Sequence, residues 1–462
     1  MPGARIVALL LLIASMLGSC VADPQQATWP QPPADRPVVE LTFRLADDLA
    51  SASGSERVTF TPDAQVCELV FRAWPNKPAT ARSGNRLTVE SVAVGGAALP
   101  LEVQAAGAPH GVPGTLVVAT LPACVPAGRP VTADLAFALR LGDRTDERVG
   151  RSPERRVAWL GSAYPMLAWN RGVGWTRDPA VDVVGESATS EAFRLRSLTV
   201  EAPDGDRVAG MGEPGATRPG SREGTTAHTF SSEVVRDVSV VVGRIDLHTG
   251  TAGDAQLTVA LPSGARASAQ VWRDQVARHL DELSRLLGPV PATHVWITVL
   301  PDVSEGVEFG ESVQIADIDP ASPRQRWLVA HELAHLWFYG LVGNNQAQHP
   351  WLDESFATWA QQVVSPADTT DDVGDGPVGG SMQHWAQVPD PDSAYVASVY
   401  ALGGQTLLEG RNAVGAQSFD AAIRGYLHRN AWRIATPADL SAALTPVPDA
   451  AGHLEEAGAF RD

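Results

Sequence analysis

Two histidines four residues apart, with a glutamate beside the first, form the segment of this sequence most suited to metal chemistry. The segment reads His331-Glu332-Leu333-Ala334-His335. Residues four apart on a helix lie on one face, one turn apart, so two imidazoles can bind one ion at about 2.0–2.1 Å. Glu332 lies on the adjacent flank, where its carboxylate can take a proton from an attacking water without replacing a ligand. The spacing therefore predicts a zinc-binding helix that carries its own general base.

A third candidate ligand, Glu354, follows His335 by nineteen residues and lies in residues 351–357, which are predicted to begin a second helix. Glycines and asparagines between residues 340 and 345 favour a turn that folds this helix back beside the first. Two histidines and one glutamate leave a fourth position open, as in catalytic zinc sites. The alternative is that the histidines are partly buried helix residues and that Glu354 is a helix-start carboxylate near the positive end of the helix dipole.

The pattern around these residues predicts the elements that must position them. Ser322 and Pro323 are suited to the start of the first metal-binding helix. Further upstream, the apolar period changes from two to 3.6 near Arg266, which predicts a helix that ends at Gly288. Strands are then expected at His294–Leu300 and Ser312–Ala316, with helices through most of the rest. We therefore predict a second domain at residues 266–462.

The preceding part of the chain, residues 38–265, is predicted to be a β-rich domain because short runs of alternating apolar and polar residues are separated by Gly, Pro, Asn and Asp. A charged stretch at residues 143–156 interleaves arginines with acidic residues and is predicted to be a solvated loop. Residues 21–37 are rich in Pro, Gln, Ala and Asp, without apolar periodicity, and are predicted to form an extended tether.

The first twenty residues have the composition of a signal peptide. Arg5 precedes an apolar run that is too short to span a bilayer comfortably. The ending Leu17-Gly18-Ser19-Cys20 resembles the lipobox of bacterial lipoproteins, which implies lipidation of Cys20; an ordinary secretory signal is the alternative. Cys67 and Cys124 then remain, either as a disulfide in an oxidising compartment or as two unpaired buried thiols.

Composition bounds the classes of function. The chain has 462 residues, 44% of them hydrophobic, which is sufficient for one or more large cores. Its formal net charge of -18 argues against a surface that binds nucleic-acid phosphates. Three cysteines exclude a scaffold built from disulfides.

The metal-binding pattern closely resembles the aminopeptidase N family of zinc metallopeptidases, which are gluzincins. The resemblance rests on H-E-L-A-H, on the eighteen residues that separate His335 from Glu354, and on W-L-D-E-S-F-A-T-W around Glu354. It implies that His331, His335 and Glu354 bind one zinc ion and that Glu332 is the general base.

A second motif of this family, G-x-M-E-N, is similar to Gly306–Gly310. Glu308 lies 23 residues before His331, and the resemblance implies that it binds the free α-amino group of the substrate. Valine and phenylalanine replace the methionine and asparagine of the motif. The sequence therefore supports peptide hydrolysis more strongly than strict specificity for the N-terminus. Glu305 or Glu311 could share the role, and a loop carboxylate that faces water is the alternative.

The segment Ser398–Gly404 resembles the V-Y-x-K-G segment of the family, which implies that the Tyr400 hydroxyl stabilises the tetrahedral intermediate. Leu402 replaces the lysine of that segment. Tyr395 is a nearby competitor, and a core tyrosine with a satisfied hydroxyl is the alternative for both.

The resemblance implies an α+β protein in which a β-rich, saddle-like N-terminal domain precedes a thermolysin-like, mainly helical zinc-peptidase catalytic domain. After helical patterns at residues 418–430 and 437–444 the sequence ends at Asp462, so the large C-terminal helical domain of the family is expected to be absent and the cleft more open.

We therefore predict a zinc metallopeptidase, an aminopeptidase that releases N-terminal residues from peptides. The alternatives are a thermolysin-like endopeptidase and a surface lipoprotein that kept the fold without catalysis. Peptide substrates are expected, nucleic acid is not, and contact with the membrane is expected only through a lipid on Cys20 at the outer face of the bacterial cell membrane.

Overall fold

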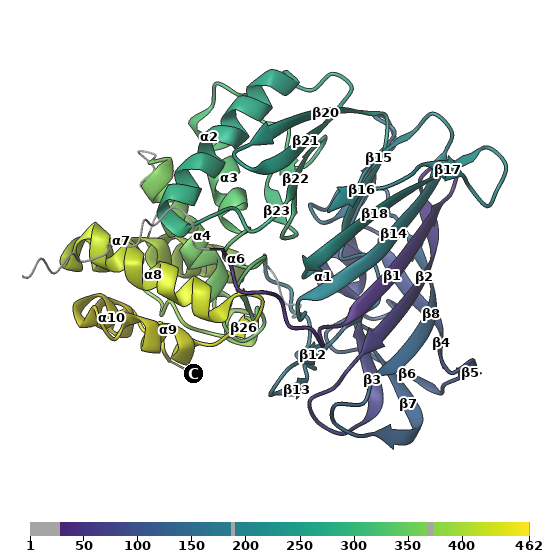
Figure 1. Ribbon diagram of the computed structural model, residues 1–462, viewed down its shortest axis with the longest axis horizontal. Helices are drawn as coiled ribbons and strands as arrows, with labels where there is room; N and C mark the ends of the chain where they lie inside the picture. Colours follow the sequence, from purple (N-terminus) through teal and green to yellow (C-terminus); the bar gives the residue numbers. More distant parts are fainter. Residues whose placement is uncertain (1–27, 186–189, 367–372, 462) are drawn as a thin grey trace, which may run out of the picture.

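The computed structural model describes residues 28–185, 190–366 and 373–461. Figure 1 shows a β-rich first part beside a second part in which helices cover a mixed sheet. The predicted signal peptide, with Cys20, and the beginning of the predicted tether lie outside the described residues. The α+β architecture predicted from the sequence is confirmed.

The first part is built from sheets whose strands alternate buried and exposed side chains, as in β1 and β2. In the largest sheet, β1 pairs with β14 in parallel and with β2 in antiparallel orientation. The strands of this sheet, in spatial order, are β16 (Glu213–Pro214), β18 (Thr225–Val235), β14 (Phe193–Pro203), β1 (Val38–Leu45), β2 (Ser51–Phe60), β8 (Val131–Arg140), β4 (Arg86–Val94) and β5 (Ala97–Ala98), with β17 (Arg218–Pro219) beside β18.

Smaller sheets complete the first part. One contains β15 (Arg207–Ala209), β19 (Ser239–Gly243), β10 (Val157–Gly161) and β9 (Val149–Ser152). Another contains β11 (Met166–Leu167), β3 (Val66–Arg72), β7 (Leu116–Val125) and β6 (Leu101–Gln104), and β12 (Trp169–Asn170) pairs with β13 (Gly174–Trp175). A short helical segment follows β3 as η2 (Trp74–Asn76) and α1 (Pro78–Arg82). A disulfide joins Cys67 of β3 to Cys124 of β7, which decides between the two states that the sequence left open.

The second part contains a mixed sheet that carries the metal-binding helices on one side. Its strands, in order, are β20 (Ile245–Ala252), β21 (Ala255–Pro262), β22 (His294–Leu300), β24 (Ser312–Ala316) and β23 (Gly306–Glu308). Strands β20 and β21 precede residue 266, yet they pair with this sheet, so by sheet membership the second part begins near residue 245. Strand β23 is the edge strand and pairs with β24 alone among the described strands.

Helices make up most of the remainder. They are α2 (Ala269–Leu287), α3 (Pro323–Ala334), α4 (Trp351–Val364), α5 (Met382–Trp385), α6 (Pro391–Tyr395), the π-helical turn η3 (Val396–Leu402), α7 (Gly403–Val414), α8 (Ala416–Asn430), α9 (Pro437–Leu444) and α10 (Pro448–Glu456); β25 (Gly343–Asn344) pairs with β26 (Ile434–Ala435). Three tryptophans are fully buried and anchor these helices in one apolar core: Trp337 in the turn after α3, and Trp351 and Trp359 in α4.

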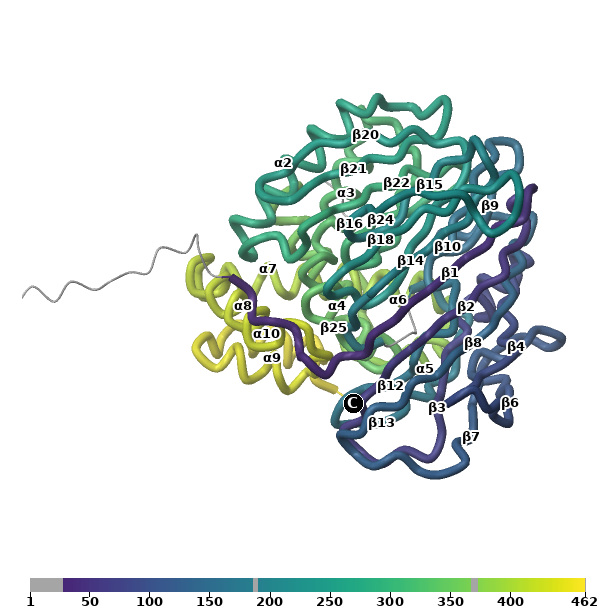
Figure 2. Tube along the Cα trace, turned by 45° about the vertical axis from the view of Figure 1, so that its right-hand side comes forward, coloured from purple at the N-terminus to yellow at the C-terminus, as the bar shows by residue number. Residues whose placement is uncertain are grey.

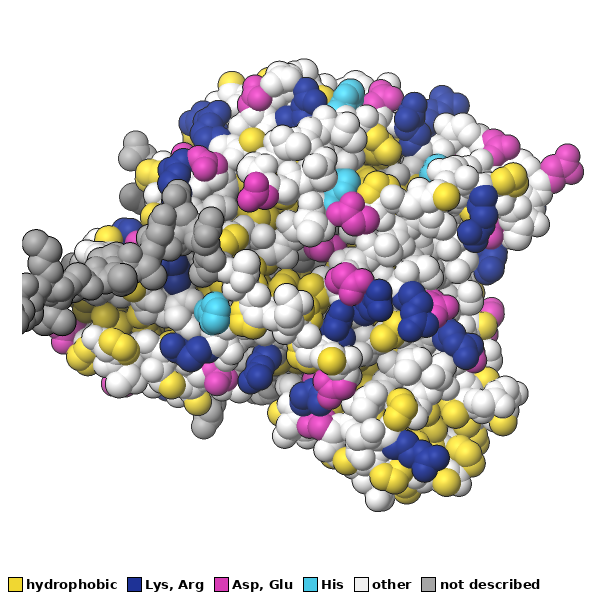
Figure 3. Space-filling model, viewed as in Figure 1, with side chains coloured by type: hydrophobic (Ala, Val, Ile, Leu, Met, Phe, Trp, Pro, Cys, Tyr) yellow, Lys and Arg dark blue, Asp and Glu magenta, His cyan; other side chains and the backbone are white. Residues whose placement is uncertain are grey.

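The segment that precedes β1 runs over the second part before it enters the first (Figure 2). The indole nitrogen of Trp29 donates to the Pro289 carbonyl at 2.9 Å, and that of Trp432 donates to the Pro30 carbonyl at 2.8 Å. This end of the predicted tether therefore packs against the helices. None of the helices in the described ranges has the length and apolar character needed to cross a membrane. On the face drawn in Figure 3, arginines are interleaved with acidic side chains.

Candidate active site

Helix α3 begins as its sequence predicts and presents both histidines at its C-terminal end. The Ser322 hydroxyl accepts from the Arg324 amide at 3.2 Å, and Pro323 occupies the first turn. His331 lies in the last turn and His335 caps the helix. Their Nε2 atoms are 3.2 Å apart, so one turn of helix has brought the two rings together.

Helix α4 supplies the third candidate ligand. Glu354 Oε2 lies 3.3 Å from His331 Nε2 and 3.5 Å from His335 Nε2. In a tetrahedral site with ligands about 2.0–2.1 Å from zinc, neighbouring ligand atoms are separated by about 3.3 Å. The three atoms therefore have the mutual spacing that one tetrahedral zinc ion requires, and all three side chains are buried.

The His335 ring is oriented by contacts on its far side. Its Nδ1 lies 2.7 Å from Asp353 Oδ1 and 3.0 Å from the Phe338 carbonyl oxygen, and both are acceptors. The proton therefore resides on Nδ1, and the Nε2 lone pair faces Glu354. Asp353 is itself held by the Gln346 side-chain amide, which donates to its other oxygen at 3.0 Å. This carboxylate and histidine pair fits a metal site and was not singled out from the sequence.

Glu332 is buried beside the two histidines. Burial raises the pKa of its carboxyl group to about 7. The side chain lies directly against Gly306 of β23, where a Cβ atom would be 2.4 Å from Glu332 Cγ. The edge strand and helix α3 can approach this closely only because residue 306 has no side chain.

Glu308 is the acidic residue of its loop that the structure brings to the candidate metal site. One of its carboxylate oxygens lies within 4.8 Å of a Glu332 oxygen and a His335 nitrogen. Glu305 instead forms an ion pair with Arg324 at the surface. Glu311 is buried near Ser232, and burial raises its pKa to about 8. Of the three glutamates considered for the amino-group role, Glu308 alone lies in this cluster.

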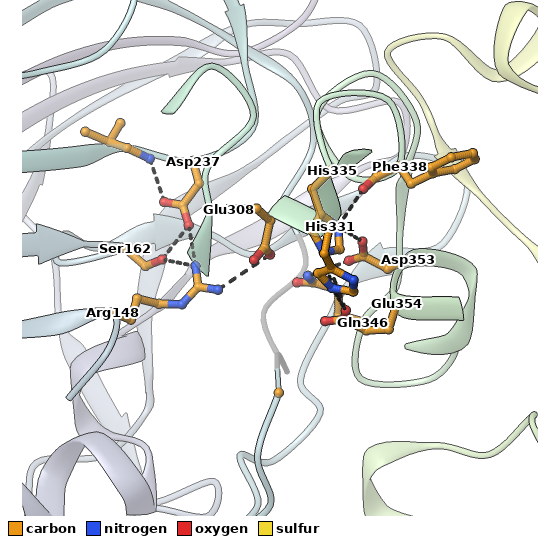
Figure 4. A network of polar contacts seen from close by, with 12 residues as sticks. Arg148, Ser162, Asp237, Glu308, His331, His335, Phe338, Gln346, Asp353 and Glu354 are labelled. Atoms are coloured by element: carbon orange, nitrogen blue, oxygen red, sulfur yellow. Dashed lines mark hydrogen bonds and ion pairs between the residues drawn. The ribbon is translucent and has the colours of Figure 1, made fainter. Parts of the chain in front are cut away.

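Arg148 of the first part contacts Glu308, so the prediction that residues 143–156 form a solvated loop is wrong at this position. Its guanidinium is 3% exposed, with Nη2 3.5 Å from Glu308 Oε1. Arg148 Nη1 donates to Ser162 Oγ at 3.2 Å and lies 3.6 Å from Asp237 Oδ2 (Figure 4). The Ser162 hydroxyl also donates to Asp237. Arg148 was missed because a mixture of charges in sequence is typical of a surface.

Tyr400 lies beside the metal-binding histidines. Its ring is nearly parallel to that of His331, with centroids 5.8 Å apart. Burial raises the pKa of the Tyr400 hydroxyl well above its usual range, and the charge of Glu354 adds to the shift, so the hydroxyl stays protonated and able to donate. The competitor Tyr395 is fully buried and packs edge-on against Tyr400.

The turn that carries Tyr400 is fixed to α4. Ser355 directly follows Glu354 in the sequence. Its Oγ donates to the Val399 carbonyl at 2.6 Å. A Cβ on Gly403 would lie 2.1 Å from that same hydroxyl, so this glycine permits the close approach. A π-helical turn is a rare conformation that often occurs at functional sites.

A helix with the H-E-x-x-H pattern and a second helix that supplies a glutamate, beside the edge strand of a mixed sheet, together form a site that can hold one metal ion next to a carboxylate base. Comparison with known proteins shows which family part of the chain resembles. Residues 319–455 match the model of the peptidase family M1 domain. This region is therefore similar to the peptidase family M1 domain, and relatives of the chain include proteins named aminopeptidase M1 and aminopeptidase N.

The two relatives described here each match less than half of the chain. Aminopeptidase M1 of Arabidopsis thaliana is 26% identical over 239 residues, which are 45% of this chain and 27% of the plant protein. Aminopeptidase N of Lactococcus lactis subsp. cremoris is 27% identical over 179 residues, 31% of this chain and 20% of that protein. The match thus spans about a quarter of the length of these relatives.

Solved structures share the whole architecture. An M1 zinc metallopeptidase from Deinococcus radiodurans has a TM-score of 0.65 at 18% identity, covering 95% of this chain and 98% of that chain. A mutant of an M1 zinc metallopeptidase from the same organism, bound to a Tyr-Ser-Ala substrate, has a TM-score of 0.68 at 16% identity, covering 93% and 95%. The two-part fold described above is therefore that of known M1 metallopeptidases.

Proposed function

We propose that the chain is an aminopeptidase that uses one zinc ion to release N-terminal residues from peptides. The observation that carries this proposal is the position of Glu308, which has an oxygen within 4.8 Å of Glu332 and His335. A carboxylate this close to the reacting centre can bind the ammonium group of a peptide only when the first peptide bond is the one presented for cleavage. The buried metal-binding triad explains hydrolysis, and Glu308 explains the release of single residues.

The residues have distinct roles in this proposal. Zinc bound by His331, His335 and Glu354 would polarise the scissile carbonyl and make the attacking water more acidic. Glu332 takes the proton of that water as attack begins and passes it to the leaving amine. Tyr400 donates a hydrogen bond to the oxygen on which negative charge develops, because its hydroxyl remains protonated.

The test compares matched aminoacyl p-nitroanilides with free and acetylated α-amino groups, using protein reconstituted with zinc and assayed for metal content. We expect cleavage of the free substrates and little cleavage of the acetylated ones. Glu332→Gln should retain zinc and lose at least about 100-fold in kcat, since it removes the general base. Normal turnover by this variant would remove Glu332 from the mechanism.

The same assay decides between this proposal and its two rivals. Equal cleavage of free and acetylated peptides would identify a thermolysin-like endopeptidase. Absence of turnover in a preparation that contains stoichiometric zinc would favour a binding protein that kept the fold.

The chain is further proposed to act outside the cytoplasm, anchored at the outer face of the cell membrane by a lipid on Cys20. The lipobox-like sequence supports this, and so does the Cys67–Cys124 disulfide, because such bonds persist in oxidising compartments. Metabolic labelling with a radioactive fatty acid in a bacterial host should label the protein but not a Cys20→Ala variant. Equal labelling of the two would exclude this anchor.

A further inference from the structure

Glu308 lies at a contact between the two parts of the molecule. The carboxylate belongs to the three-residue edge strand β23, which pairs only with β24 among the described strands. Arg148, which contacts Glu308 Oε1, belongs to the first part and precedes β9 directly. In Figure 4 the guanidinium approaches Glu308 from the side opposite the metal-binding histidines. The carboxylate therefore lies between a fixed cation and the candidate metal site.

The Arg148 guanidinium is itself held on several sides. Ser162 and Asp237 lie at one nitrogen, at 3.2 Å and 3.6 Å. The central carbon lies 5.0 Å from the ring centroid of Trp74 and 4.9 Å from that of Phe309. These are cation–π distances, and Phe309 is the residue that follows Glu308. The cation is thus fixed by groups of the first part and by the residue that directly follows the edge strand carrying Glu308.

This arrangement fits a positioning role better than a purely structural one. A glutamate on a short edge strand has several accessible rotamers, and an ammonium anchor is effective only when its oxygen is fixed before the substrate arrives. The buried Arg148 guanidinium forms an ion pair with one oxygen of the carboxylate and so restricts its position. The carboxylate, which has an oxygen within 4.8 Å of Glu332 and His335, can then bind a ligand on that side.

Resting on the proposed function, we infer that Arg148 is a specificity-determining residue, which positions Glu308 to bind the substrate's α-ammonium group and thereby selects peptides with a free N-terminus. The first part of the molecule accordingly contributes to substrate selection through Arg148, and Ser162 and Asp237 support it.

The test measures KM and kcat for a free aminoacyl p-nitroanilide with Arg148→Met, Arg148→Lys and Glu308→Gln, and with both Met and Gln changes combined. Arg148→Met should raise KM by roughly 10- to 100-fold, because it removes the charged partner of a buried ion pair, with a smaller change in kcat. Arg148→Lys should restore part of this loss, because it returns the charge without the planar fork. In the Glu308→Gln background the Arg148→Met change should leave KM nearly unaltered, because there is no longer an anion to position.

Two controls separate positioning from folding. Ser162→Ala removes one hydroxyl and should raise KM by about two- to fivefold even if Arg148→Met proves unstable. Arg156→Met breaks a partly buried ion pair of the first part, with Asp206, and should leave KM unchanged. Thermal unfolding and zinc content are recorded for every variant.

An unchanged KM in Arg148→Met or Ser162→Ala would overturn the inference, and so would an equal rise in KM with and without Glu308. If the wild-type protein cleaves free and acetylated substrates equally, the proposed aminopeptidase function fails first. If it requires a free amino group but the Arg148 and Ser162 variants keep normal KM, only the role of Arg148 is lost.

Discussion

Replacing Gly306 by alanine should slow catalysis without removing the metal. A Cβ at this position would lie 2.4 Å from Glu332 Cγ and 2.5 Å from its Cδ and Oε1. Comfortable contacts between such atoms begin at about 3.5 Å. The backbone at Gly306 is not in the left-handed region, so alanine can adopt it and the Glu332 side chain must move by about 1 Å. The perturbation therefore falls on the proposed general base.

A displacement of about 1 Å at a catalytic group can cost roughly 100-fold, which corresponds to about 2.7 kcal/mol in the activation free energy. Stability should change much less, because the displaced atoms belong to the end of a flexible side chain. The assay measures kcat and KM with zinc-loaded protein, together with zinc content and the thermal unfolding midpoint. We expect a large fall in kcat, a small change in KM and stoichiometric zinc.

The matched control is Gly452→Ala in α10, where a new Cβ meets no atom within 4 Å. It should stabilise the protein by about 0.5–1 kcal/mol and leave kcat unchanged. If a zinc-loaded Gly306→Ala variant kept the wild-type kcat, Glu332 would not be the general base. If kcat fell only because zinc was lost, the prediction would also be wrong, because the substitution would then have disturbed the metal site and not Glu332.

Other predictions follow from single contacts. Asp353→Asn should weaken zinc binding by about 10- to 100-fold in a chelator competition, because it disturbs the acceptor that orients His335; unchanged affinity would contradict this role. Glu311→Gln should change the pH dependence of stability. Burial raises the pKa of the Glu311 carboxyl group to about 8, whereas in the unfolded chain this pKa is near 4.5, so between these two pH values the folded state holds a proton that the unfolded chain has released. The wild type should therefore lose up to about 4 kcal/mol relative to the variant as pH rises from about 4.5 to 8, and a difference in urea unfolding that is equal at pH 5 and pH 8 would exclude this explanation. Arg236→Met should lower the free energy of unfolding by about 3 kcal/mol or more, because the buried guanidinium donates to the carbonyls of Tyr339 and Ser190 at 2.8 Å; a loss below about 1 kcal/mol would show that water replaces it.

Local chemistry explains why the helices of the site were predictable. The Ser322 and Pro323 start of α3 and the four-residue spacing of its histidines are properties of one helix, so sequence determines them directly. The predicted strands at His294–Leu300 and Ser312–Ala316 match β22 and β24. Every residue of both strands is buried, including the polar Ser312 and Gln314, as expected for strands covered on both faces.

Contacts between distant segments account for what the sequence did not reveal. Strand β20 has an alternating pattern that fits either part, and only its pairing with β21 places it in the second sheet. Arg148 lies 160 residues before Glu308, in a stretch whose mixed charges resemble an exposed loop. The Asp353 contact with His335 depends on how α4 folds back on α3, which spacing alone does not specify.

The two halves of the proposed chemistry consequently depend on different kinds of structure. Hydrolysis relies on His331, His335 and Glu354, which lie within 24 residues of one another and converge through one pair of helices. Selection of a free N-terminus relies on Glu308, whose position depends on a cation from the other part of the molecule. Small shifts between the two parts would therefore change which peptides bind while leaving the metal ligands in place, because the Arg148 contact crosses that boundary and the ligand contacts do not. Under the proposed function, substrate selection would for this reason be a property of the contact between the two parts.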